Sequence, residues 1–160
     1  MPQKNAIGDR GESIFNTRIT QDNLFKVYFM GEKAPIVDFL LEILDDATPY
    51  YFMVQVKGTT QGYQVGGNLR ANVEESKMIK LLERKMPTYV AGVDVNDEIV
   101  YLCPAFDINT RYPSIPTNHF LKLSDKPGSR VTLDLLKQDV INFWNNSNMS
   151  NYKSSYVSLL

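Results

Sequence analysis

The sequence predicts an α/β (α+β) domain in which helices flank a single mixed sheet. Two observations support this prediction: short runs of branched and aromatic residues bounded by turn residues, and longer segments whose apolar residues recur at helical spacing. The expected order is a helix, three strands, a helix, two strands, an irregular segment and a last helix. Elements in this order pack as layers around one sheet.

Length and composition are those of one globular domain. The chain has 160 residues, of which 43% are hydrophobic and 22% charged, enough for one hydrophobic core. We expect a single domain over residues 1–145, with a core at about 7–106, an irregular segment at 107–130 and a helix at 132–145. Residues 146–160 are rich in Asn and Ser, and we expect a polar, flexible tail there.

Composition also disfavours several classes of function. The net charge of -1 gives no strong field toward polyanions, so nucleic-acid binding would need a local patch. His119 and Cys103 are single residues of their types, too few for a His/Cys zinc site, and no nucleophile motif lies near His119. There is no signal-like segment, and no apolar run approaches the roughly 20 residues of a membrane span. The cytoplasm is therefore the expected location.

The first part of the chain is expected to form one helix and three strands. They should lie at 7–19, 24–31, 35–44 and 50–58. In the helix, Ile14, Phe15 and Ile19 share a partly apolar face. Residues 35–44 fit a short buried helix by composition, but Pro35 at their start and the turn residues after them favour a strand that forms a hairpin with the next one.

Capping signals mark the two later helices. Asn72, followed by Glu75 three residues on, predicts the start of the second helix, and Pro87 its end. Thr132 is the expected cap of the last helix. Between these helices, strands at 88–95 and 98–106 should form a hairpin at the far side of the sheet.

A polar spot interrupts the apolar strand at 50–58. Gln55 and Lys57 are two residues apart, so they project from one face about 7 Å apart, and the hairpin places Asp38 beside them. Such groups cost desolvation unless they are paired, and Mg²⁺ would pair them. The candidate ligands are Asp38, Gln55, the Val56 carbonyl and Glu12 of the first helix. A salt bridge between Asp38 and Lys57 without a metal is the alternative.

These residues carry a resemblance to a known group of proteins. Glu12 in "GDRGE", Asp38 in "APIVDFLLEIL", and Gln55 with Lys57 in "VQVKGT" stand in the order of the PD-(D/E)XK nuclease superfamily. The chain is most similar to its small bacterial families of the DUF4365 type, over residues 7–106. The resemblance implies a restriction-endonuclease-like α-β-β-β-α-β core. It also implies hydrolysis of phosphodiester bonds of DNA with Mg²⁺ or Mn²⁺, in bacterial defence or on mobile elements.

The resemblance assigns a role to each residue of the set. Glu12 takes the place of the helix acid, Asp38 of the metal aspartate, and Lys57 of the lysine that holds the attacking water or stabilises the phosphoryl oxygens. Gln55 stands where the second acid is expected, which removes a negative charge from the metal site. The proline also lies three residues before Asp38 instead of directly before it. Burial is expected to lower the pKa of Lys57.

Further contacts to nucleic acid are weaker predictions. Arg70, Lys77 and Lys80 could meet a phosphate backbone, although a solvated helix face explains the two lysines equally well. Gly66 and Gly67 lack the spacing of a phosphate loop, so a flexible loop is expected there. Cleavage of duplex DNA would favour a homodimer. The alternative function is a catalytically inactive binding or regulatory module with the nuclease fold.

Overall fold

The structure, a computed structural model, describes residues 2–31, 37–44, 47, 49–82, 85–105, 114–117, 121–124 and 129–146. Its elements are α1 (Pro2–Thr20), β1 (Phe25–Phe29), β2 (Phe39–Ile43), β3 (Tyr51–Thr59), α2 (Glu75–Leu82), β4 (Thr88–Asp94), β5 (Ile99–Pro104), β6 (Leu121–Leu123) and α3 (Ser129–Asn145). In the described part of the chain, the strands form one sheet in the order β1-β2-β3-β4-β5-β6. Among these described strands, only β3 and β4 pair in parallel. The predicted α/β (α+β) class with a single mixed sheet is therefore confirmed.

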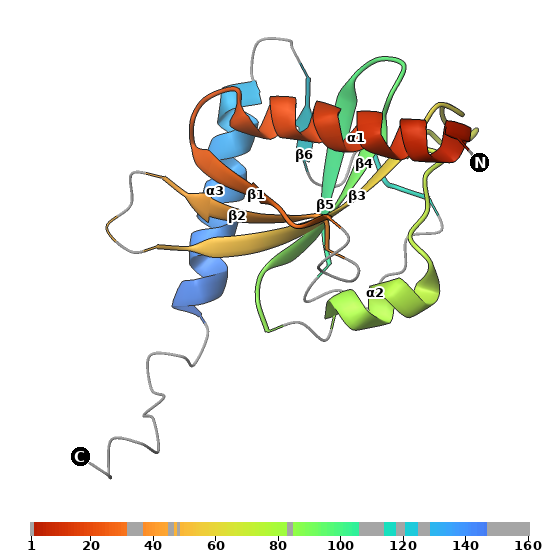
Figure 1. Ribbon diagram of the computed structural model, residues 1–160. Helices are drawn as coiled ribbons and strands as arrows, with labels where there is room; N and C mark the ends of the chain where they lie inside the picture. The colour runs from red at the N-terminus through yellow and green to blue at the C-terminus, as the bar shows by residue number, and fades with distance from the viewer. Residues whose placement is uncertain are drawn as a thin grey trace.

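Helices cover both faces of the sheet (Figure 1). On one face, apolar side chains of α1 and α3, such as Phe15 and Leu136, pack against β2, β3 and β4. On the other face, Met78 and Leu81 of α2 pack with the segment around Leu69. The middle strands β3 and β4 lie between these two cores, as the nearly unbroken apolar run of β3 predicts. No helix among the described residues is both long and apolar enough to cross a membrane.

The predicted hairpin in the first half is confirmed, with shorter strands. Residues 39–43 form β2, an antiparallel neighbour of both β1 and β3, so the strand interpretation was right and the helix alternative wrong. Asp38 lies directly before β2 but keeps its place in the ladder, because its N–H donates to the Val54 carbonyl at 3.0 Å and its carbonyl accepts from Met30 N at 2.9 Å. Pro35 lies outside the described residues.

The second helix starts later than its capping pattern predicts. The Glu74 carbonyl accepts the N–H groups of Lys77 and Met78 at 3.0 Å each, so Glu74 is the residue that caps α2. Asn72 is exposed and precedes the helix, and its prediction as the cap was wrong. Lys77, three residues after this cap, is half-buried.

The second half contains one strand that the sequence pattern does not predict. Residues 121–123 form β6 within the segment expected to be irregular, and β6 is the edge of the sheet. The predicted β4–β5 hairpin is confirmed by the antiparallel pairing of these strands. Because the hairpin lies between β3 and β6, its expected position at the far side of the sheet was wrong. The last helix begins at Ser129, so Thr132 lies inside it. His119 and all of the predicted tail except Asn146 lie outside the described residues.

Candidate functional site

Asp38 lies where the ladder between β2 and β3 ends. The side-chain Oδ2 of Asp38 accepts the Val56 N–H at 2.7 Å, a bond that a further residue of β2 would otherwise supply. Strand N–H groups point along the sheet toward the neighbouring strand, so this bond holds the carboxyl group close to the plane of the sheet. Side chains from both faces of the sheet can therefore contact the Asp38 carboxyl group.

Gln55 is buried beside Asp38, with only 6% of its surface exposed. Its Nε2 donates to Asp38 Oδ2 at 3.0 Å and to the Val56 carbonyl at 3.2 Å. The amide nitrogen thus contacts two of the oxygen atoms that the sequence proposes as metal ligands. A side-chain amide presents nitrogen or oxygen to the same neighbours after a half-turn, so the same residue can serve as a donor or as an oxygen ligand.

Glu12 approaches Asp38 from α1. Burial, the nearby carboxyl groups of Asp38 and Asp9, and a hydrogen bond to Asp38 raise the pKa of Glu12 to about 7. The pKa of Asp38 is raised as well, mainly by burial, although the bond from Val56 and the cations Lys57 and Lys77 oppose that rise. Two carboxyl groups in contact cannot both ionise cheaply, so they share a proton near neutral pH.

Lys57 lies close to Asp38, and Lys77 of α2 lies next to Lys57. Burial and the neighbouring Lys77 lower the pKa of Lys57, while Asp38 and Glu74 partly oppose this shift. The prediction that burial lowers this pKa is confirmed. The site thus contains a carboxyl pair of raised pKa beside an amine of lowered pKa, a combination that is common where protons are transferred.

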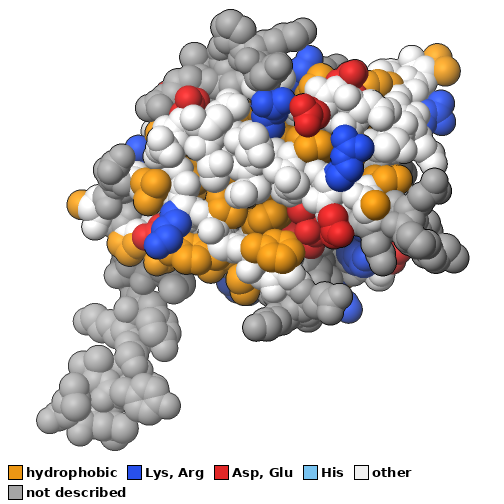
Figure 2. Space-filling view, turned by 45° about the horizontal axis from the view of Figure 1, so that its top comes forward, with side chains coloured by type: hydrophobic (Ala, Val, Ile, Leu, Met, Phe, Trp, Pro, Cys, Tyr) orange, Lys and Arg blue, Asp and Glu red, His pale blue; other side chains and the backbone are white. Residues whose placement is uncertain are grey.

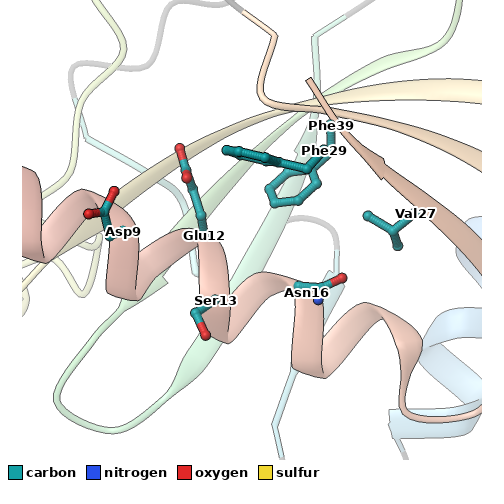
Figure 3. Close-up of a pocket in the computed structure, with 7 residues that line it drawn as sticks. All are labelled: Asp9, Glu12, Ser13, Asn16, Val27, Phe29 and Phe39. Carbon is teal, nitrogen blue, oxygen red and sulfur yellow. The ribbon is translucent and has the colours of Figure 1, made fainter. Parts of the chain in front are cut away.

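Glu12, Asp38, Gln55, Lys57 and Lys77 together form the cluster. Two hollows of opposite charge flank it. One has a volume of about 290 Å³ and is lined by Asp9, Glu12, Ser13, Asn16, Val27, Phe29 and Phe39. In Figure 3, Glu12 points from α1 toward the rings of Phe29 and Phe39, and acidic and hydrophobic side chains adjoin on the face shown in Figure 2. The other hollow, of about 430 Å³, is lined by Ile7, Lys57, Gly58, Thr59, Thr60, Gln61, Arg70, Ala71 and Asn72.

The three residues predicted to contact nucleic acid, Arg70, Lys77 and Lys80, lie in different places. Arg70 lines the basic hollow, and Lys77 belongs to the cluster itself. Lys80 is exposed on α2 and lines neither hollow. Glu42 lies at the other end of β2 from Asp38 and accepts the Tyr28 hydroxyl at 3.0 Å. The proximity of Lys77 to Lys57 was not predicted, because it depends on how α2 packs on the sheet and no local pattern gives that packing.

The residues of the cluster fit a hard divalent cation. Within the described ranges no group of three His, Cys, Asp or Glu side chains is placed to hold a metal ion. The cluster offers instead two carboxyl groups, the Gln55 amide and the Val56 carbonyl, and oxygen donors of these kinds suit Mg²⁺ or Mn²⁺. Burial and the neighbouring carboxyl groups, which raise the pKa of Glu12, disfavour its ionised form here, and a bound cation would offset both effects. Comparison of the chain with known protein families, curated proteins and solved structures gave no match.

Proposed function

We propose that this protein is a metal-dependent nuclease that hydrolyses phosphodiester bonds of DNA. The observation that carries the proposal is the position of Asp38, which interacts with Glu12 on one side and with Lys57 on the other. Phosphoryl transfer needs negative oxygen ligands for a cation and a positive group for the reacting phosphate, close together but in separate places. The cluster offers both.

Glu12, Asp38, Gln55 and the Val56 carbonyl would hold Mg²⁺ or Mn²⁺. When bound, such an ion supplies positive charge that polarises a phosphoryl oxygen and lowers the pKa of a coordinated water. Loss of the shared proton readies Glu12 and Asp38 for that role, and rotation of the Gln55 amide turns its oxygen toward them.

Lys57 carries the proton transfer in this proposal. Its ammonium group donates hydrogen bonds to the negative oxygens of the reacting phosphate. With its pKa lowered, a fraction of Lys57 is neutral and accepts a proton from the attacking water, while the water oxygen bonds to phosphorus and the bond to the leaving oxygen breaks. The leaving oxygen takes its proton from solvent. Burial, and then repulsion by Lys77, lower the pKa of Lys57 and so favour this proton transfer.

A second function is favoured by one feature of the same cluster. Gln55 replaces an acid, and its amide satisfies both Asp38 and the Val56 carbonyl without any cation. Among the described residues, no buried side-chain nitrogen or oxygen lacks a hydrogen-bond partner. A cluster satisfied in this way suits a nuclease-fold module that binds or regulates without catalysis.

Incubation of plasmid and single-stranded DNA with Mg²⁺ or Mn²⁺ separates the two functions. The nuclease proposal expects cleavage that falls at least about a hundredfold in Asp38→Asn and in Lys57→Ala, because each removes a group from the reacting centre. Glu42→Gln, which neutralises an acid on the same strand away from the cluster, should cleave normally. DNA that stays intact under both metals, or variants that all cleave equally, would favour the non-catalytic module.

The setting we propose for this activity is the cytoplasm, where bacterial defence nucleases act on foreign DNA. The single Cys103 cannot form a disulfide within the chain, which favours a reducing compartment. A homodimer would bring two sites to the two strands of a duplex. The mass of the protein in solution, with and without DNA, tests the dimer directly.

A further inference from the structure

The basic hollow beside the cluster is a second polar surface, which the proposed reaction uses only through Lys57. Among the residues that the structure describes, its lining includes two cations, Lys57 and Arg70, and no acid, whereas the hollow on the α1 side has Asp9 and Glu12 and no cation. Hydroxyl and amide side chains of Thr59, Thr60, Gln61 and Asn72 complete the wall. Two cations surrounded by neutral donors form a site for an anion.

Arg70 is held in place by the backbone around it. Its own N–H donates to the Gly62 carbonyl at 2.9 Å, and its side-chain Nε donates to the Tyr63 carbonyl at 3.0 Å. The second bond fixes the guanidinium group yet uses only one of its five N–H donors. The group is therefore oriented before a ligand arrives, which lowers the entropic cost of binding.

The segment that carries Arg70 is itself anchored at two points. The Tyr63 hydroxyl donates to buried Asp94 at 2.7 Å and pairs with the Tyr101 hydroxyl at 2.8 Å. Leu69 exchanges two backbone hydrogen bonds with Ile115, at 2.8 and 3.0 Å. These contacts tie the wall of the hollow to β4, β5 and the 114–117 segment, so the wall keeps its shape.

We propose that this hollow binds a phosphate group of the polynucleotide next to the phosphate that reacts at Asp38 and Lys57. The inference rests on the proposed function, since Lys57 belongs to both the cluster and the hollow. The planar guanidinium of Arg70 matches two phosphate oxygens at once, and Thr60 and Asn72 add donors beside it. The volume of about 430 Å³ exceeds the needs of a phosphate alone and leaves room for the attached sugar.

Binding of a short labelled single-stranded oligonucleotide, followed by fluorescence anisotropy in EDTA so that no cleavage occurs, tests the proposal. Arg70→Gln should weaken binding about tenfold and reduce the slope of log affinity against log salt by about one. Asn72→Ala, at an exposed position of the same wall, should weaken it less. Lys26→Gln is the matched control, because it removes the same charge from β1, at the far end of the β1–β2 hairpin from Asp38.

The source of the phosphate is resolved by backbone NMR titrations with inorganic phosphate and with the oligonucleotide. The proposal expects Thr60, Arg70 and Asn72 amides to shift with both, but to saturate at far lower concentrations of oligonucleotide. It is overturned if Arg70→Gln and Lys26→Gln bind alike, or if only inorganic phosphate moves these amides. Loss of cleavage alone does not contradict the phosphate-binding proposal. If the protein never cleaves DNA but binds the oligonucleotide through Arg70, the nuclease proposal is wrong and the phosphate-binding proposal stands.

Discussion

Gly11 of α1 lies directly against Gly58 of β3. A Cβ atom on Gly11 would come within 3.1 Å of the Gly58 Cα, and a Cβ atom on Gly58 would come within 3.1 Å of the Ile7 carbonyl oxygen. Backbone meets backbone here, so neither partner can yield by rotating a side chain. This contact brings α1 close to the sheet. Glu12 follows Gly11 in the chain and Lys57 precedes Gly58, so the close approach lies next to both candidate residues.

The helix therefore has two glycines with opposite expected responses to alanine. Gly8→Ala should stabilise the protein by about 0.5–1 kcal/mol, because alanine favours the helix and nothing lies within 4 Å of the added Cβ. Gly11→Ala gains the same propensity but forces α1 away from β3, at a cost of about 1–3 kcal/mol. We expect a net loss near 1 kcal/mol, measured by urea unfolding. Equal stabilisation by both substitutions would contradict the close contact.

Stability without metal should depend on pH through Glu12. Its pKa is about 7 in the folded protein and 4.5 ordinarily, so the folded state holds a proton that the unfolded chain has lost between those values. The free energy of unfolding should consequently fall as pH rises from about 4.5 to about 7, and this contribution should level off above it. The raised pKa of Asp38 acts in the same direction.

Glu12→Gln isolates that effect. The variant keeps the shape of the side chain but cannot ionise, so it should gain stability relative to the unsubstituted protein at about pH 8 and lose most of the advantage at about pH 5. Urea unfolding in EDTA at both values measures the difference. Asp97→Asn, at an exposed position of the turn between β4 and β5, serves as a control for general charge effects. A pH slope unchanged in Glu12→Gln would show that Glu12 and Asp38 do not share a proton.

Much of the site could be predicted from local rules, because strand geometry is simple. Residues two apart share a face, and an antiparallel hairpin pairs Asp38 with the region of Gln55, so the convergence of Asp38, Gln55 and Lys57 follows from the order of the strands alone. Glu12 was also placed correctly near them, but on resemblance and not on any pattern in α1. Alternation along a strand determines which face of the sheet each side chain occupies, but it does not determine how closely a helix approaches the sheet.

The features that were missed depend on contacts between distant segments. β6 has only three residues, and its pairing with β5 crosses a long segment, so no local run marks it. Lys77 interacts with Lys57 because of the way α2 packs on the sheet, and helical spacing within α2 does not predict which strand residues the helix meets. No sequence pattern predicts the contact between Gly11 and Gly58, because a glycine in a sequence usually indicates a turn or the interruption of a helix.

Gln55→Glu should make the cluster bind metal more tightly, and it should lower the free energy of unfolding when no metal is bound. The change replaces the donor that serves Asp38 and the Val56 carbonyl with a third negative group at a position that is 6% exposed. In EDTA at neutral pH this should cost about 3 kcal/mol or more. The same carboxylate adds an oxygen ligand, so Mn²⁺ should bind at least about tenfold more tightly and raise the melting temperature further.

The matched control is Gln64→Glu, which makes the same chemical change at an exposed position away from the cluster. It should leave both stability in EDTA and the response to Mn²⁺ near those of the unsubstituted protein. Asp38→Asn should abolish the response to Mn²⁺ altogether, because it removes a carboxylate ligand from the cluster. If Gln55→Glu and Gln64→Glu respond to Mn²⁺ identically, the cation does not bind at this cluster.

The two tyrosines beside the basic hollow should differ in their cost to stability. The Tyr63 hydroxyl lies between Asp94 Oδ2 and the Tyr101 hydroxyl, and it has one proton, which it donates to Asp94. Tyr63→Phe leaves the buried Asp94 oxygen without that donor and the Tyr101 hydroxyl without its acceptor, so we expect a loss of about 1–3 kcal/mol. Tyr101→Phe keeps the bond to Asp94 and should cost about 1 kcal/mol.

The double variant distinguishes a network from two separate bonds. Once Tyr63 is replaced, the Tyr101 hydroxyl has lost its partner, so the second substitution should add little, and a coupling energy of at least about 0.5 kcal/mol is expected in urea unfolding. Loss of the Tyr63 anchor should also speed hydrogen exchange at Leu69 and Arg70, because the wall of the hollow is then held mainly through the 114–117 segment. Additive costs with unchanged exchange at Arg70 would mean that Asp94 stabilises only its own turn, whose N–H groups at Asn96 and Asp97 it also accepts.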